Sequence, residues 1–172
     1  MSVTKKTYLV CYDDRRTFTE DLRKKFSDTS KYSVESFHSI GEFADHLKKM
    51  TDKKSFRVAV IVIPDAAEQL EVMEKLTTEI SRAGTDTGII LLVAPNRIDE
   101  LKKVIKFNID AFIPKNANAI LRIHNEVKKL ISEYNINVSR KHRNVSLYVL
   151  IIFIFLCLLA ILIAYLRLPG YF

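Results

Sequence analysis

The chain has 172 residues, with 27 lysines and arginines against 20 aspartates and glutamates, for a net charge of +7. Charges of both signs are interspersed along the sequence, as on solvated helix faces, which disfavours a nucleic-acid partner. The only two cysteines, Cys11 and Cys157, fall in an expected strand and in a C-terminal apolar segment, so we expect no disulfide. There is no Gly-rich phosphate loop, no metal-ligand spacing and no complete catalytic set, so we expect no enzyme activity.

Short apolar runs alternate with amphipathic segments through residues 1–135, which is the size of one ordinary domain. The apolar runs predict five strands in chain order, at 8–11, 32–37, 58–63, 89–94 and 111–113. Apolar residues at three- and four-residue spacing predict five helices, at 17–26, 40–50, 69–80, 98–107 and 117–134. This alternation indicates an α/β fold with a five-stranded parallel sheet, doubly wound, with helices on both faces.

The last predicted element is an apolar run of 22 residues, 145–166, with no charged residue. As a helix it would be about 33 Å long, enough for a bilayer core of about 30 Å. The alternative is a buried core helix, but such helices rarely exceed about 14 residues without a polar face. The run contains no ionisable group for an ion path, so we expect an anchor or a packing helix.

Basic residues set the expected orientation of this span. Arg140, Lys141 and Arg143 precede it, whereas only Arg167 follows it, so the preceding domain is expected in the cytoplasm. The predicted organisation is a domain at 1–135, a basic juxtamembrane linker at 136–144, a transmembrane helix at 145–168 and a short extracytoplasmic tail at 169–172. This describes a single-pass, tail-anchored protein of the cytoplasmic (inner) membrane, whose linker would also attract anionic lipid headgroups.

Three segments of the domain suggest a relationship to a known family. Leu9-Val-Cys-Tyr-Asp-Asp14 ends the first strand, Leu70-Glu-Val-Met73 begins the third helix, and Asn108-Ile-Asp-Ala-Phe-Ile-Pro-Lys115 covers the last strand. In this order and on these elements, residues 6–134 resemble the response-regulator receiver domain, the CheY-like fold. The resemblance implies a site at the carboxyl ends of the strands, which is where sheets of this kind bind ligands.

The retained parts of that site follow from the resemblance. The acidic pair that holds a divalent cation in the family maps onto Asp13 and Asp14, and the lysine that contacts the phosphoryl group maps onto Lys115. The aromatic switch residue maps onto Phe112, with a core position as the alternative. Without a third carboxylate only weak Mg²⁺ binding is expected. The pair has an equal alternative as a turn at a helix N-terminus, and we favour a structural ion pair between Lys115 and the pair over a working ligand.

Two parts of the implied site are missing. Alignment on Pro64 or on the third helix puts the phosphoryl acceptor at Val60 or Ile61, and neither side chain can be phosphorylated. The Thr or Ser hydroxyl that the resemblance implies near the end of the fourth strand falls on Val93, which has no hydroxyl. A local shift of the chain would offer Asp65 as a substitute acceptor.

These features predict a non-catalytic pseudo-receiver that acts as a protein-binding accessory or regulatory subunit of a membrane complex, with no required cofactor. Its partners are expected at the transmembrane helix and at the surface formed by 98–107, 111–113 and 117–134. That surface includes four basic residues: Lys102, Lys106, Arg122 and Lys129. The first alternative is a phosphorylatable switch that uses Asp65 in membrane-localised two-component signalling. The second is a tail anchor that places a binding module on anionic lipid.

Overall fold

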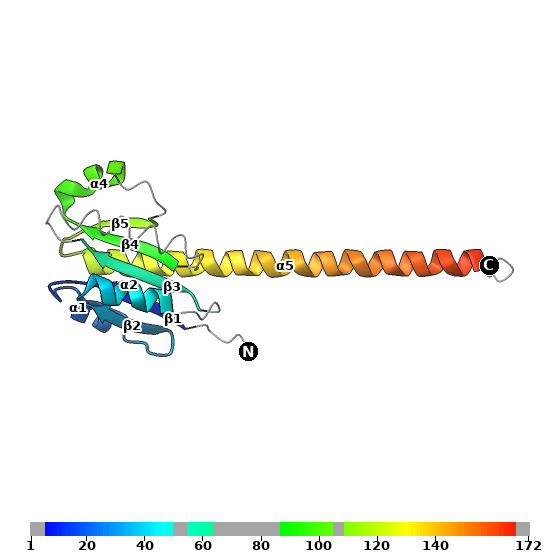
Figure 1. The fold of residues 1–172 in the computed structure, drawn as a ribbon, viewed down its shortest axis with the longest axis horizontal. Helices are drawn as coiled ribbons and strands as arrows, with labels where there is room; N and C mark the ends of the chain where they lie inside the picture. Colours follow the sequence, from blue (N-terminus) through cyan, green and yellow to red (C-terminus); the bar gives the residue numbers. More distant parts are fainter. Residues whose placement is uncertain (1–5, 50–54, 64–86, 105–108, 168–172) are drawn as a thin grey trace. The chain divides into compact units, whose positions relative to one another are not determined.

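The computed structural model describes residues 6–49, 55–63, 87–104 and 109–167 (Figure 1). The chain divides into two compact units, Met1–Ser132 and Glu133–Phe172. The first unit holds the sheet and its helices. The second consists of the later part of the last helix.

Five parallel strands form one sheet in the order β2-β1-β3-β4-β5. Their bounds are β1 Thr7–Tyr12, β2 Tyr32–Phe37, β3 Arg57–Val62, β4 Thr87–Val93 and β5 Ala111–Pro114. Every described residue of β3 is buried, as expected of a strand that is covered on both faces. The predicted five-stranded parallel α/β sheet is therefore confirmed.

The described helices follow the predicted order. They are α1 Thr19–Lys25, α2 Ile40–Lys49, α4 Ile98–Val104 and α5 Ala119–Arg167, with a 3-10 turn η1 at Pro95–Arg97. The helix predicted at 69–80, with its Leu70–Met73 segment, lies outside the described residues, as do Pro64, Asp65 and Lys106.

One face of the sheet packs against α2 and α4. Side chains from β1, β3 and β4 form a buried cluster there with two residues of α2, Phe43 and Leu47, and with Leu101 of α4. Phe43 also lies against the rings of Tyr12 and Phe37, at centroid distances of 6.0 and 6.3 Å. Figure 1 shows α2 in front of the sheet in this view.

The opposite face is covered by α1 and the first part of α5. A Cβ atom built on Gly88 in β4 would lie 2.9 Å from Leu130 of α5, so the strand and the helix approach closely at this glycine. Phe26, at the end of α1, contacts the ring of His124 in α5 at a centroid distance of 5.4 Å. Helices on both faces complete the doubly wound arrangement.

His124 predicts a pH dependence of stability. Burial lowers its pKa below the ordinary 6.5, and the positive charges of Lys128 and Lys25 lower it further. Because the unfolded chain then takes up this proton more readily than the folded domain does, the free energy of unfolding should fall as the pH drops below about 6.5. Urea unfolding of the full-length protein at pH 7.5 and 5.5 should show this loss, and His124→Gln should reduce it. An equal loss in His124→Gln would contradict this account.

Helix α5 differs from the predicted organisation of the C-terminal region. We expected the domain helix to end at Tyr134 and a linker to occupy 136–144, but α5 is helical throughout Ala119–Arg167. The physical reason is that no proline or glycine occurs between these bounds, so nothing in the sequence stops the helix. The predicted linker is therefore part of a helix.

Within the described parts of the chain, no helix is both long enough and apolar enough to cross a membrane. The span at 145–168 therefore stays a prediction.

Candidate functional site

The carboxyl ends of the parallel strands bring most of the predicted site residues to one edge of the sheet. Asp13 and Asp14 follow β1, Ile63 follows β3, Val93 ends β4 and Lys115 follows β5. In α/β sheets of this type ligands bind at this edge.

Asp13 is buried, and its carboxylate organises the turn that leads into α1. Its Oδ2 accepts a hydrogen bond of 2.8 Å from the backbone N–H of Phe18 and one of 3.5 Å from the Thr19 hydroxyl. Its Oδ1 accepts a bond of 3.3 Å from the backbone N–H of Arg15. Both carboxylate oxygens therefore accept hydrogen bonds from the turn that precedes α1, and they hold that turn together. Asp14 is exposed.

This arrangement makes the two aspartates unequal. Asp13→Ala should lower the free energy of unfolding by about 1–2 kcal/mol, because it leaves the turn donors without their acceptor. Asp14→Ala, at an exposed position, should change it by about 0.5 kcal/mol or less. Chemical denaturation of both variants is the measurement. If Asp13→Ala were as stable as the wild type or more so, the two carboxylates would be crowded in a metal-type acidic pair, and the hydrogen bonds of Asp13 would not stabilise the turn.

His38 lies beside Asp13, and sequence reasoning did not select it. The Nδ1 atom of His38 is 2.8 Å from the backbone carbonyl oxygen of Asp13. Because a carbonyl only accepts hydrogen bonds, Nδ1 carries the proton in this contact. The backbone N–H of Asp13 also donates to the carbonyl of Phe37, at 3.1 Å. The strand order is the signal that could have found His38. Because β2 pairs with β1 and His38 directly follows β2, this histidine lies at the same edge of the sheet as Asp13.

The end of β3 lies opposite the acidic pair, and it is aliphatic throughout. Tyr12 of β1 is in register with Ile61 of β3. Continuing that register places Val62 level with Asp13, and Ile63 level with Asp14. Val60, Ile61, Val62 and Ile63 are all buried. Val62 and Ile63 thus lie one to three residues beyond Val60 and Ile61, the positions that alignment assigns to the phosphoryl acceptor, and neither Val62 nor Ile63 is a carboxylate.

Lys115 contacts the end of β3. Its Nζ donates a hydrogen bond of 2.6 Å to the backbone carbonyl of Ile63, and its backbone N–H donates one of 2.8 Å to Val93. The half-buried ammonium group thus reaches across β4 to a main-chain oxygen. The predicted contacts of Lys115 were a phosphoryl group or the acidic pair, and the structure adds the Ile63 carbonyl.

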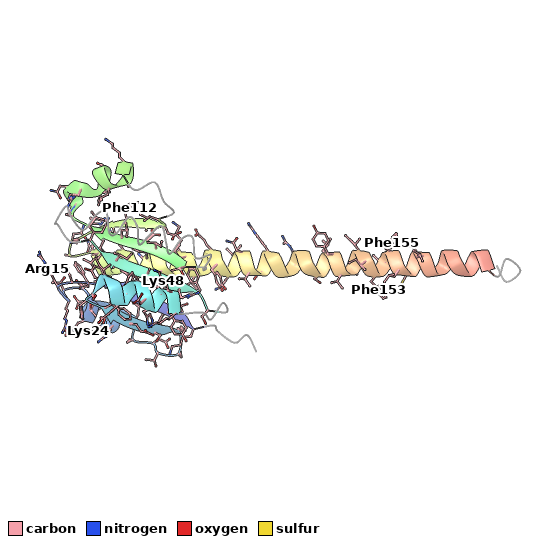
Figure 2. The ribbon with its side chains drawn as sticks, viewed as in Figure 1. Arg15, Lys24, Lys48, Phe112, Phe153 and Phe155 are labelled. Atoms are coloured by element: carbon pink, nitrogen blue, oxygen red, sulfur yellow. The ribbon has the colours of Figure 1, made fainter. Side chains whose placement is uncertain are left out.

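Val93 and Phe112 belong to the packing of the domain. Val93 is buried in the cluster beneath α2 and α4, and the half-buried Phe112 packs against the same cluster (Figure 2). Phe112 therefore occupies the core position that the sequence left as the alternative to a switch residue. Its possible switch role stays a prediction.

The two nucleophile-type side chains at the end of β1 are kept protonated. Burial raises the pKa of the Cys11 thiol to about 12, with the negative charge of Asp13 adding to the effect. Burial also raises the pKa of Tyr12, and Asp14 and Asp13 raise it further. Since the thiolate is the reactive form of cysteine, Cys11 is inert at neutral pH.

The surface expected to bind partners is described in part. Lys102 in α4 and Arg122 in α5 are exposed, and Lys129 forms an exposed ion pair of 3.4 Å with Glu126. Leu121, next to Arg122, is 51% exposed. Among residues 6–49, 55–63, 87–104 and 109–167, no three His, Cys, Asp or Glu side chains gather closely enough to hold a metal ion.

Comparison with known proteins supports the fold. No protein-family model and no curated protein matches the sequence. Among solved structures the chain is similar to full-length FixJ from B. japonicum, a response regulator, with a TM-score of 0.54 and 18% sequence identity. The match covers 76% of this chain and 60% of FixJ, so the chain spans well under the full length of that protein. A likeness at this identity shows the fold alone: the chain has a receiver-like α/β fold.

Proposed function

We propose that this chain is a receiver-like, protein-binding subunit that does not accept a phosphoryl group. The observation that carries the proposal is the aliphatic end of β3, where Val62 and Ile63 lie level with the acidic pair. Phosphoryl transfer to a receiver requires a carboxylate nucleophile there, together with a hard cation that offsets the charge of the phosphoryl oxygens. Among the described residues, none supplies that carboxylate.

The remaining site residues support the same reading. Asp13 uses both carboxylate oxygens in the turn before α1, and metal binding would compete with those hydrogen bonds. The Lys115 ammonium donates to the Ile63 carbonyl, which keeps it level with the end of β3. These contacts hold the carboxyl edge of the sheet together, which is a structural role.

Whether the protein accepts a phosphoryl group can be tested directly. Full-length protein is incubated with Mg²⁺ and acetyl phosphate, and its intact mass is measured against a working receiver treated in parallel. We expect no phosphoryl adduct. An adduct that disappears in Asp65→Ala but persists in Asp21→Ala, a change at an exposed aspartate of α1, would establish the alternative function, a phosphorylatable switch that uses Asp65. The acidic pair and Lys115, which are retained at the same edge of the sheet, are the observations that favour this alternative.

We further propose that the apolar part of α5 anchors the protein in the cytoplasmic membrane, with the receiver-like domain in the cytoplasm. From Leu147 to Ile161, α5 exposes large apolar side chains, including Tyr148 at 67% and Phe153 at 64%. Figure 2 shows Phe153 and Phe155 on opposite sides of the helix. A helix that is apolar all round must be covered, and the sequence run 145–166 has the length that a bilayer covers.

Membrane attachment and a lost acceptor together favour a subunit of a membrane complex over a diffusing signal carrier. The partner surface proposed here is α4, β5 and the first part of α5, where Leu121 offers exposed apolar area next to the positive charge of Arg122. Purification of the full-length protein in mild detergent should retain a membrane protein partner. Leu121→Asp combined with Arg122→Glu should release that partner, whereas Lys24→Glu, an exposed change on α1, should not. If both variants retained the partner equally, the interface would not be at Leu121 and Arg122.

A further inference from the structure

One face of α5 in the second unit changes from basic to apolar along the helix axis. Arg140, Arg143 and Ser146 are exposed and three residues apart, so they lie on one side of the helix. Arg143 and Ser146 also line a shallow hollow, and the other residues that line it are apolar. The hollow is lined by Arg143, Ser146, Leu147, Val149, Leu150 and Phe153.

The dimensions of this face match half of a bilayer. From Arg143 to Phe153 the helix rises about 15 Å. That is about half of the 30 Å hydrocarbon thickness, so a side chain at the depth of Arg143 would stand at the headgroups when Phe153 is near the midplane. The three apolar residues of the face are well exposed, Leu147 at 53%, Leu150 at 57% and Phe153 at 64%.

The basic end of this face has little negative charge near it, because the one acidic residue of the second unit, Glu133, lies seven residues before Arg140. Residues 134–172 contain no aspartate or glutamate, whereas Arg140, Lys141 and Arg143 follow each other closely. A negative charge must therefore come from elsewhere.

We propose that this face, Arg140, Arg143, Ser146, Leu147, Leu150 and Phe153, is a binding surface for an anionic phospholipid. The phosphate group accepts hydrogen bonds from the Arg143 guanidinium and the Ser146 hydroxyl, while one acyl chain lies along Leu147, Leu150 and Phe153. Arg140, one turn further out, faces the outer part of the charged headgroup. This inference rests on the proposed membrane anchor, and it adds a lipid class and a specific side of the helix.

The chain has no tryptophan, so a single introduced tryptophan reports on its own surroundings. Phe153→Trp places the reporter on the proposed lipid face, and Phe155→Trp places it on the other side of the helix (Figure 2). Each full-length variant is reconstituted in phosphatidylcholine vesicles that contain 20% phosphatidylglycerol. The fluorescence is compared when only the phosphatidylglycerol chains are brominated and when an equal amount of phosphatidylcholine is brominated instead.

We expect brominated phosphatidylglycerol to quench the Phe153→Trp fluorescence more than brominated phosphatidylcholine does. The reason is a local enrichment of phosphatidylglycerol, of up to about fivefold for each arginine that contacts its headgroup. Adding Arg143→Gln should lower the preference by up to about fivefold, while Lys24→Gln, which removes an exposed charge in the first unit, should leave it unchanged. The Phe155→Trp reporter should show no preference. Equal quenching of Phe153→Trp by both lipids would overturn the lipid site and leave the anchor intact. No quenching by either lipid, in either reporter, would overturn the anchor as well.

Discussion

Val60→Asp should unfold the receiver-like domain under conditions in which the wild type is folded. Val60 has no exposed surface, and its register partners in β1 and β4 are Cys11 and Ile90, both also buried. Neither of these two register partners offers a carboxylate a cation or a strong hydrogen-bond donor. The expected loss is about 3–5 kcal/mol of the free energy of unfolding, a large share of the 5–15 kcal/mol that a domain has.

Val60→Ala is the matched control for Val60→Asp. It removes methyl groups without adding charge, so its smaller loss measures the packing contribution alone. Circular dichroism and urea unfolding at pH 7 compare the two variants. If Val60→Asp remained folded and gained Mg²⁺ binding, position 60 would face the acidic pair, and the register that places Val62 and Ile63 there would be contradicted.

Two arginines in the apolar part of α5 should detach the protein from membranes. Ile152 and Phe155 are 59% and 62% exposed and lie near the middle of the run 145–166. An arginine near the centre of a membrane helix costs about 3 kcal/mol for insertion, so Ile152→Arg with Phe155→Arg costs about 6 kcal/mol. The measurement is the fraction of protein that stays with membranes after alkaline carbonate washing.

Ile136→Arg is the control for the charge itself, because Ile136 is also exposed on α5 but lies outside the run. The double variant should leave the membrane fraction, and Ile136→Arg should stay in it. If the double variant stayed as firmly bound as the wild type, the apolar run would not be the anchor, and an apolar partner protein would be the remaining cover for this surface.

The sequence predicts the sheet well because buried strands have a clear signal. Tyr32–Phe37 was predicted with the bounds of β2, and the runs at 58–63 and 89–94 fall within one or two residues of β3 and β4. The end of the domain helix was predicted less well. The apolar face of this helix predicts Tyr134 as its last residue, but a helix continues until something stops it, and no glycine or proline does so before 167.

The site was predictable only where it depends on strand ends. Asp13 and Lys115 lie at the carboxyl edge of the sheet because they follow β1 and β5. The apolar runs of the sequence locate both of these strands. The level of β3 against β1 was not predictable, since Pro64 and the third helix give different alignments and register depends on packing between strands. The Lys115 contact with the Ile63 carbonyl, and that of His38 with the Asp13 carbonyl, involve backbone acceptors, which every residue has.

In the function proposed above, the carboxyl edge of this receiver-like sheet is structural and does not bind a phosphoryl group. The most direct measurement is backbone NMR of the full-length protein in detergent micelles, during titration with beryllofluoride in the presence of Mg²⁺. The amide signals of Asp13, Ile63 and Lys115 report on the acidic pair, the end of β3 and the lysine contact. We predict no saturable shift at any of the three. Saturable shifts at Asp13 and Lys115 together would show a working phosphoryl site and would contradict the account.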